Sequence, residues 1–318
     1  MSTSAKVWIA LWVVYIVWGS TYLGIELVGE TMPATFAAGV RFTAAGLLML
    51  GFIAWRRGPA RLRLTRRELA SSAVVGLLLP GANSILFITE QKVPIGLTSL
   101  IIAAIPLWVV LLRLLAGERP DLVSTIVLLV GFGGIVLLVQ PGSDTGPLGY
   151  LLLTVLGSFL WALGSFLSPR IPVPRDALVA TGYEMLVGGL VLLAIGLAVY
   201  SPSELDPGRW SGRSIFGLCY LIVFGSLLGY SAYVWLLANA PIAKVSTYAY
   251  VNPVVAIALG VIVLDESLTL RIVAGALLIL AAVAIVLRRE ARTAVPLEPG
   301  QVVGPNGDAG QLAPARRS

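Results

Sequence analysis

Two ionisable residues, one basic and one acidic, interrupt long apolar segments and are the first candidates for chemistry. Arg41 lies in the segment from Ala34 to Trp55, and Glu184 lies in the segment from Ala177 to Tyr200. A charge inside a membrane-spanning helix is costly and marks a functional group by default. If these segments span a membrane, we expect Arg41 and Glu184 to act as gating or coupling residues.

The depths of these two charges suggest that they serve opposite faces of the membrane. Each lies about seven residues, or roughly 10 Å, from the entrance of its own helix. In a hydrocarbon core about 30 Å thick, entrances on opposite faces leave roughly 10 Å between Arg41 and Glu184, so we expect no ion pair. Glu90, near the outer end of the third apolar segment, is a candidate partner for Arg41. The alternative is that Arg41 reaches the outer headgroups and Glu184 pairs with Arg175 or Lys244.

Aromatic and amide side chains could line a pocket for a small organic solute, because such pockets are mostly apolar with a few polar groups. Tyr230 and Tyr233 are three residues apart, and Tyr248 and Asn252 are four apart, so each pair shares a helix face. For each aromatic residue the alternative is packing or a place in the interfacial aromatic belt. The candidate substrate-binding residues are Trp18, Asn83, Trp161, Tyr230, Tyr233, Tyr248 and Asn252.

Proline and small residues should shape the helices around this pocket. Pro106 and Pro253 each remove a backbone hydrogen bond and are expected to kink two helices. Two pairs of small residues permit close helix packing, either within the chain or in a homodimer. These pairs are Ser20 with Gly24 and Gly225 with Gly229.

Acidic residues follow two apolar segments, at Glu118 and at Asp265 and Glu266. We expect these carboxylates to cap the segments that follow them. The alternative is a role in proton coupling.

Several kinds of chemistry lack the residues they need. The sequence has no His, and its single Cys219 lies in an apolar run, which leaves no His-dependent triad, zinc site or disulfide. Because no phosphate-binding Gly-rich loop with a Lys occurs, we expect neither a metal nor a nucleotide cofactor. An intramembrane enzyme would need two positioned titratable groups, so it is a remote alternative, as is a membrane sensor.

The candidate residues must be positioned by membrane-spanning helices. Of 318 residues, 58% are hydrophobic and 12% are charged, against about one quarter charged in soluble domains. The mean hydropathy is +0.92. A spanning helix needs about 20 apolar residues, and the sequence offers ten such stretches. We expect an all-α membrane protein with five transmembrane helices in 1–140, five in 148–288, and a disordered Pro- and Gly-rich tail at 291–318.

The positions of Lys and Arg predict the orientation in the bilayer. The net charge of +6 would suggest a nucleic-acid partner in a soluble protein, but here the basic residues concentrate in short loops, so no nucleic acid is expected. With a cytoplasmic N-terminus, 17 basic residues lie on the cytoplasmic side and four on the other, which predicts that both termini are cytoplasmic. No signal-peptide cleavage pattern follows the first apolar run, so we expect that run to be retained as a helix.

The two halves of the sequence are related to each other. Because each half has an odd number of helices, the second copy would enter the membrane from the opposite face. Such inverted repeats hold a substrate site between the halves near the midplane and permit alternating access. The recurring positions are Pro94 and Pro106 with Pro241 and Pro253, 147 residues later, and Trp18 and Gly39 with Trp161 and Gly182, 143 residues later.

Several short motifs resemble those of one transporter family. They are WGSTY at Trp18–Tyr22, GVRF at Gly39–Phe42, EQKVP at Glu90–Pro94, GERP at Gly117–Pro120, FGS at Phe224–Ser226 and STYAYVNP at Ser246–Pro253. With these motifs the sequence resembles EamA-type members of the drug/metabolite transporter superfamily, in the YedA-like branch. The resemblance implies ten helices, a central cavity between the halves, and export of amino acids, other metabolites or drugs.

Together these features predict a multi-pass transporter of a bacterial inner membrane. We expect it to export small organic metabolites, amino-acid-like or amphipathic, by alternating access, coupled to protons or to a substrate gradient. The alternatives within transport are uptake and facilitated exchange.

Overall fold

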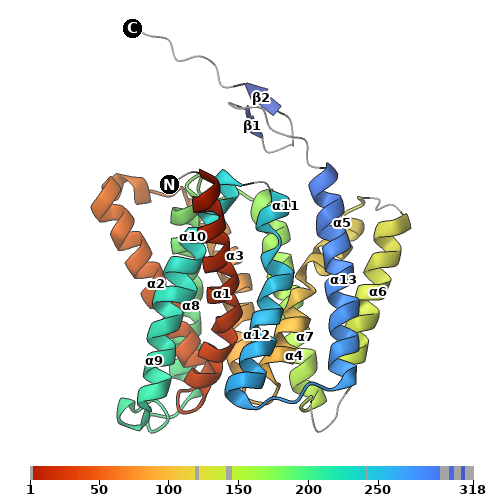
Figure 1. Cartoon of the computed structure of the whole chain (residues 1–318). Coiled ribbons are helices and arrows are strands. Elements are labelled where there is room, and N and C mark those ends of the chain that lie inside the picture. The colour runs from red at the N-terminus through yellow and green to blue at the C-terminus, as the bar shows by residue number, and fades with distance from the viewer. Residues whose placement is uncertain are drawn as a thin grey trace.

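The computed structural model describes residues 3–118, 122–140, 145–240, 242–293, 301–303 and 309–311. These residues form a bundle of helices, with one short strand pair beyond it (Figure 1). The α-helices are α1 (Thr3–Gly29), α2 (Ala34–Arg57), α3 (Arg66–Thr89), α4 (Ile95–Ala103), α5 (Ile105–Leu115), α6 (Leu122–Leu138), α7 (Leu148–Leu167), α8 (Ala177–Val199), α9 (Gly212–Tyr220), α10 (Gly229–Asn239), α11 (Ile242–Val245), α12 (Tyr248–Leu264) and α13 (Leu270–Thr293). Between them lie the 3₁₀ helices η1 (Pro59–Leu62), η2 (Ser168–Arg170) and η3 (Pro207–Arg209) and the π-helix η4 (Leu221–Leu228).

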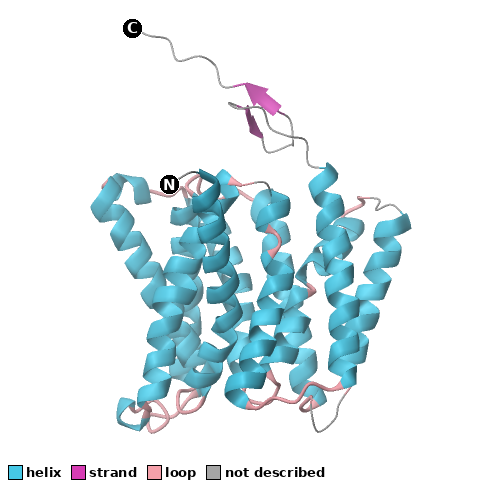
Figure 2. Cartoon of the chain, viewed as in Figure 1, coloured by secondary structure: helices cyan, strands magenta, loops and turns pink. Residues whose placement is uncertain are grey.

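Most of these helices are long and apolar enough to cross a bilayer. Among the described residues, eight helical segments qualify by length and composition, and two shorter apolar helices cover Thr125–Leu138 and Tyr248–Leu264. Large apolar side chains such as Trp12, Phe52 and Ile262 face outward, as expected for a protein whose solvent is lipid. The loops lie mainly at the two ends of the bundle, as Figure 2 shows.

Helices α2 and α8 pack against each other through their backbones. A Cβ atom added at Gly39 would lie 2.6 Å from Cα of Leu193, and one added at Gly46 would lie 2.6 Å from N of Leu186. Only glycine permits so close an approach. Helix α1 packs on α12 and on the α9–η4–α10 segment, α3 packs on α7 and α8, and α6 packs on α13.

Two spanning segments are interrupted inside the bundle. Helix α4 ends at Ala103, and α5 begins at Ile105 with Pro106 as its second residue, as expected for a proline that cannot continue the preceding hydrogen-bond pattern. In the second half the interruption falls at residues 246–247, between α11 and α12, and Pro253 lies further on, inside α12.

The chain enters and leaves the helical bundle at the same end. The start of α1 and the end of α13 are at the same end of the bundle (Figure 1). In the tail, where the sequence predicts disorder, α13 extends to Thr293, and the strands β1 (Gln301–Val303) and β2 (Ala309–Gln311) pair antiparallel, with Val302 opposite Gly310. The rest of the tail, like Arg119, Pro120 and Pro241 of the sequence motifs, lies outside the described residues.

Candidate functional site

Arg41 lies in the interior of the bundle, where its side chain is only 2% exposed. Its Nη1 donates to Oδ1 of Asn83 on α3 at 2.9 Å, and its Nε donates to Oγ of Ser226 on η4 at 3.2 Å. The guanidinium carbon is 4.8 Å from the centroid of the Phe42 ring, a cation–π contact. Both hydrogen-bond partners are neutral, so they orient the positive charge without cancelling it.

This arrangement argues against the alternative that the Arg41 side chain reaches the outer headgroups. A side chain that reached the headgroups would be exposed at its tip, whereas the Arg41 guanidinium is held within the bundle by two other helices. The expected partner Glu90 forms no ion pair or hydrogen bond with Arg41 in the described part of the chain.

The π-helix η4 supplies part of this site. A π turn carries one extra residue per turn, and such turns are frequent at functional sites. In η4 the carbonyl of Gly225 accepts a hydrogen bond from Nε1 of Trp18 at 3.2 Å, and the adjacent Ser226 accepts the bond from Arg41. Gly225 also permits the approach of these helices, because a Cβ there would lie 3.0 Å from Thr21 and 3.2 Å from Nη2 of Arg41.

Three of the predicted aromatic residues meet around a fourth, Trp18. The Trp18 ring centroid lies 5.2 Å from that of Tyr230, 5.1 Å from that of Tyr233 and 5.3 Å from that of Tyr248. Tyr233 and Tyr248 are 5.6 Å apart in an edge-to-face contact, a geometry that aromatic pairs favour. Helices α1, α10 and α12 thus share one aromatic cluster, made of Trp18, Tyr230, Tyr233 and Tyr248.

A small inner cavity adjoins the aromatic cluster at the interruptions of the spanning segments. Its volume is about 70 Å³, and its lining includes Tyr22, Pro106, Tyr248, Asn252 and Pro253. In the orientation that satisfies its neighbours, the Asn252 amide donates to the carbonyl oxygens of Tyr15 and Tyr248 at 3.2 Å. Both predicted prolines therefore face one cavity together with two of the predicted binding residues.

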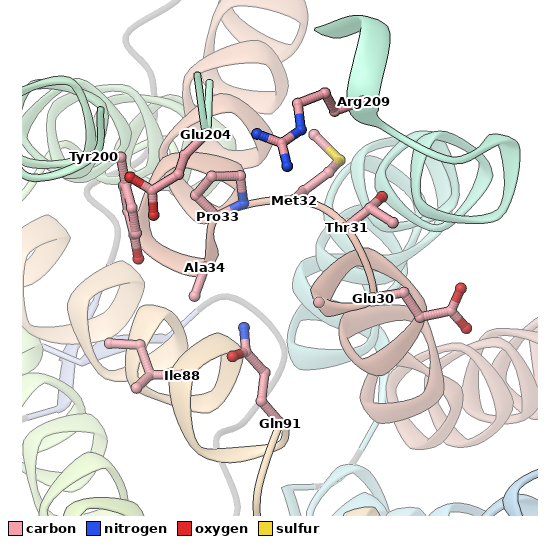
Figure 3. A pocket seen from close by; sticks show the side chains of 11 residues that line it. Glu30, Thr31, Met32, Pro33, Ala34, Ile88, Gln91, Tyr200, Glu204 and Arg209 are labelled. Atoms are coloured by element: carbon pink, nitrogen blue, oxygen red, sulfur yellow. The ribbon is translucent and has the colours of Figure 1, made fainter. Parts of the chain in front are cut away.

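A larger outer cavity opens between the α1–α2 loop, the end of α3 and the α8–α9 loop. It measures about 550 Å³. Figure 3 shows Arg209 and Glu204 reaching over it from the α8–α9 loop, with the Gln91 amide facing them from the end of α3. The Glu30 side chain points away from the cavity in Figure 3, consistent with its ion pair to Arg213 at 3.2 Å.

Three carboxyl groups gather near the end of α3 that adjoins the outer cavity. Glu90 is 4% exposed and follows the last residue of α3. It interacts electrostatically with Glu26 of α1 and with Glu266 of the α12–α13 loop. We call Glu26, Glu90 and Glu266 the carboxyl cluster. Within the part of the chain that the structure describes, no group of three or more His, Cys, Asp or Glu has a geometry suited to a metal ion.

Comparison with known proteins places this arrangement in a family. The profile of the EamA-like transporter family matches residues 6–140 and matches again at residues 148–288. The chain belongs to the EamA-like transporter family. It is therefore a membrane transporter of the drug/metabolite superfamily, as its motifs indicate, and its apolar helices make it a multi-pass protein.

Relatives of this EamA-like chain include named transporters. The chain is 36% identical over 253 residues to the "Uncharacterized inner membrane transporter YedA" of Escherichia coli K12, covering 79% of this chain and 80% of that protein. It is 30% identical to "Protein PecM" of Dickeya dadantii, covering 85% and 88%. It is 25% identical to the "Probable amino-acid metabolite efflux pump" of E. coli K12, covering 84% and 90%. A crystal structure at 20% identity shares the fold, with a TM-score of 0.60 over 92% of this chain and 99% of that one.

Other predicted residues of this EamA-like transporter lie apart from the aromatic cluster. Asn83 is engaged with Arg41, and Trp161 on α7 is half-buried and lines neither cavity described above. Glu184 on α8 does not pair with Arg175 or Lys244 among the described residues. The Lys244 ammonium instead lies 4.3 Å from the centroid of the Trp8 ring. The electrostatic neighbour of Glu184 is Tyr230 of the aromatic cluster.

The acidic residues that follow α5 and α12 make hydrogen bonds that the sequence does not predict. Glu118 accepts hydrogen bonds from Arg113 at 2.5 Å and from Arg170 at 2.9 Å. These contacts lower the pKa of Glu118, chiefly through the hydrogen bond from Arg113. Residues 119–121, which precede α6, lie outside the described residues, so capping of α6 by Glu118 stays a prediction. Glu266 caps a helix distant in sequence, since it accepts from the N–H groups of Ile95 at 2.6 Å and Gly96 at 3.1 Å. The expectation that Glu266 caps the segment after it was therefore wrong.

For several residues of the site, the sequence did not indicate which partners they contact. Ser226 was part of a family motif, but its bond to Arg41 depends on the π turn of η4. Glu26 and Tyr22 of α1 gain their importance only from the neighbours that the fold brings to them. The small pairs are used inside the chain: Gly24 packs on Leu221, and Gly229 packs on Trp18.

Proposed function

We propose that this chain is a secondary transporter that exports small organic metabolites, amino-acid-like or amphipathic, across a bacterial inner membrane by alternating access. The observation that carries the proposal is the buried Arg41, whose charge is oriented by neutral partners close to the aromatic cluster. An oriented but uncancelled cation can receive the carboxylate of a solute. The relatives named an inner membrane transporter and an amino-acid metabolite efflux pump support this location, substrate class and direction.

Reciprocal glycine contacts support the division into two inverted halves. Gly39 packs on Leu193, and Gly182 packs on Leu50; the 143-residue offset that relates Gly39 to Gly182 also relates Leu50 to Leu193. A two-fold axis makes each contact occur twice. If one residue contacts another across the interface, the symmetry-related copies of both residues contact each other as well.

A second pair of contacts repeats this relation. Gly46 packs on Leu186, and Gly189 packs on Thr43, and the same 143-residue offset relates Gly46 to Gly189 and Thr43 to Leu186. The exchange of α2 and α8 about such an axis supports ten spans arranged as repeats at 1–140 and 148–288. In this arrangement α4 with α5, α9 with η4 and α10, and α11 with α12 each form one span.

The basic residues support an orientation with both termini in the cytoplasm. The loop between α2 and α3 carries Arg61 and Arg63 and is flanked by Arg57 and Arg66. It lies at the same end of the bundle as the start of α1 and the end of α13 (Figure 1). A cytoplasmic excess of Lys and Arg sets this orientation. The outer cavity then opens to the opposite side of the membrane.

In the proposed cycle, the aromatic cluster and the inner cavity bind the apolar part of the solute, while Arg41 orients its anionic group. Asn83 holds the Arg41 guanidinium, and Asn252 supplies a polar group in the inner cavity. The break before Pro106 and the break at residues 246–247, before α12 with its internal Pro253, provide bending points in two paired spans. Arg41 serves the outer gate, and Glu184 of the second repeat serves the inner one, while Trp161 binds the solute.

Flux measurements in proteoliposomes test this function. A panel of radiolabelled amino acids and common metabolites is loaded inside or outside vesicles that contain the full chain, and counterflow is recorded. Selective counterflow is expected for a transporter, and its absence for the whole panel would contradict the proposal. Arg41→Gln and Glu184→Gln should each reduce flux, with Arg56→Gln, an exposed residue at the end of α2, as the matched control. Normal flux in both variants would refute the gating roles. Flux that runs only inward would favour uptake.

A further inference from the structure

The Glu90 carboxyl group is buried without a partner. Its side chain is 4% exposed, and neither Oε1 nor Oε2 has a hydrogen-bond partner among the described residues. A buried, unpaired carboxylate is costly, so such a group either holds a proton or is kept for a ligand.

The charged and titratable groups around Glu90 come from three other elements. Helix α1 presents Glu26 and Tyr22, α2 presents Arg41, and the α12–α13 loop presents Glu266. Helix α4, which begins at Ile95, carries no titratable side chain. Glu90 therefore faces two acidic groups and one basic group.

The basic group forms no hydrogen bond or ion pair with Glu90 among the described residues. Arg41 directs its Nε and Nη1 toward Ser226 and Asn83. Of the two acidic neighbours, Glu266 is fixed at the N-terminus of α4. Oε2 of Glu26, in contrast, is buried and has no hydrogen-bond partner within the described part of the chain. The carboxyl cluster thus contains two carboxyl groups with unsatisfied oxygens.

Residues close to Glu90 line both cavities, although the Glu90 side chain itself lines neither. Ile88 and Gln91, on either side of it in the chain, line the outer cavity of about 550 Å³. Tyr22, its neighbour on α1, lines the inner cavity of about 70 Å³ beside the interrupted helices. Both cavities therefore come close to the Glu90 residue, one of them at the end of α3 and the other beside the interrupted helices.

The environment of Glu90 also favours its protonated form. Burial raises the pKa of Glu90 well above its ordinary value, the negative charges of Glu26 and Glu266 raise it further, and Arg41 acts in the opposite direction. Glu266 shows the same primary effect, since burial raises its pKa while the bonds from Gly96 and Ile95 lower it.

We propose that Glu90 is the proton-coupling site of this transporter, at which a proton from the outer side is exchanged for the ammonium group of an outgoing solute. This inference rests on the proposed export function and names its driving ion. The carboxylate accepts one proton from outer water and becomes a neutral carboxylic acid. After the gates exchange, that proton leaves to the cytoplasm as the ammonium group of the next solute takes its place. One proton enters for each solute exported.

Infrared difference spectroscopy tests proton binding without any substrate. The full chain in lipid nanodiscs is titrated from acidic to alkaline pH, and the C=O stretch of protonated carboxyl groups is followed. The wild type should show a carboxyl band that persists well above the pH range of free Glu, and Glu90→Gln should lose the component of that band that persists to the highest pH. Glu118→Gln, which removes an exposed, Arg-paired carboxylate, is the matched control and should keep it. An unchanged band in Glu90→Gln overturns the proposal.

A transport assay then tests coupling. In proteoliposomes with a pH gradient, the wild type should concentrate whichever amino acid shows counterflow, while Glu90→Gln should exchange it without accumulation. Glu90→Asp, which keeps a titratable group, should restore accumulation and shows that the site tolerates substitution. Accumulation by Glu90→Gln at the wild-type level overturns the inference. If the carboxyl band titrates as expected but the wild type moves no solute, the export function fails and the proton site stands.

Discussion

The Arg41 guanidinium donates a hydrogen bond from Nη1 to Oδ1 of Asn83 at 2.9 Å and thereby links α2 to α3 inside the bundle. An amide oxygen can hold a guanidinium in place, but it cannot neutralise it. A carboxylate at position 83 would do both, because it accepts the same hydrogen bond and carries the opposite charge. With an amide at position 83, Arg41 is held in place while its positive charge stays available to bind an anionic group.

Asn83→Asp is therefore expected to stabilise the protein while lowering transport of solutes that carry a carboxylate. The new ion pair replaces a bond to a neutral group and should raise the midpoint of thermal unfolding in detergent, while cancelling the charge that receives the solute. Counterflow should fall roughly tenfold, corresponding to about 1.4 kcal/mol of lost interaction. Asn239→Asp, at the exposed end of α10, is the control. Undiminished counterflow in Asn83→Asp would show that the charge of Arg41 is not used for binding.

The aromatic cluster should depend more on the ring of Trp18 than on its N–H group. Trp18→Phe loses the hydrogen bond to the Gly225 carbonyl but keeps a ring beside the three tyrosines, a cost of about 1 kcal/mol. Trp18→Ala removes the ring and should cost about 3–5 kcal/mol and most of the flux. Trp12→Ala on the same helix, where the side chain is exposed, should change unfolding much less. Equal effects of Trp18→Ala and Trp12→Ala would contradict a special role for this cluster.

The Glu118 ion pairs should make stability depend weakly on acid pH. Because the pKa of Glu118 is lowered in the folded chain, its stabilisation is present above the unfolded-state pKa and is lost as the pH falls through the folded-state pKa. The side chains are about 41–45% exposed, so the effect is at most about 1 kcal/mol. Thermal unfolding of the wild type and Glu118→Gln should therefore differ near neutral pH and converge in acid. If the two proteins still differ in unfolding temperature at acid pH, that difference comes from packing and not from the ion pairs.

Charges and glycines of the site could be predicted from the sequence because their signals are local. An Arg or Glu within an apolar stretch stands out by composition alone, and Gly39 and Gly182 stand out by their repeat offset. The partners of these residues could not be predicted. The bond from Arg41 to Ser226 spans 185 residues and needs the π turn of η4.

Long-range capping shows the same limit. Glu266 appeared suited to the segment after it, yet it serves the first N–H groups of α4, 171 residues earlier. Hydropathy and offsets describe each helix by itself, while capping partners and the carboxyl cluster arise only when α1, α3 and α12 are brought together. For that reason the carboxyl cluster had no signature in the sequence.

Adding one methyl group between α2 and α8 should disrupt the centre of the bundle. A Cβ at Gly39 would lie 2.6 Å from Cα of Leu193, and since that neighbour is backbone, the helices themselves must separate. Gly39→Ala should therefore cost about 1–3 kcal/mol of stability through overpacking and should lower flux by changing the interface that alternating access requires. Gly51→Ala on the same helix meets nothing within 4 Å and should be neutral or slightly stabilising, since Ala is the better helix former. Comparing the two variants by thermal unfolding and counterflow separates the contact from helix propensity, and equal behaviour would show that α2 and α8 do not pack through this glycine.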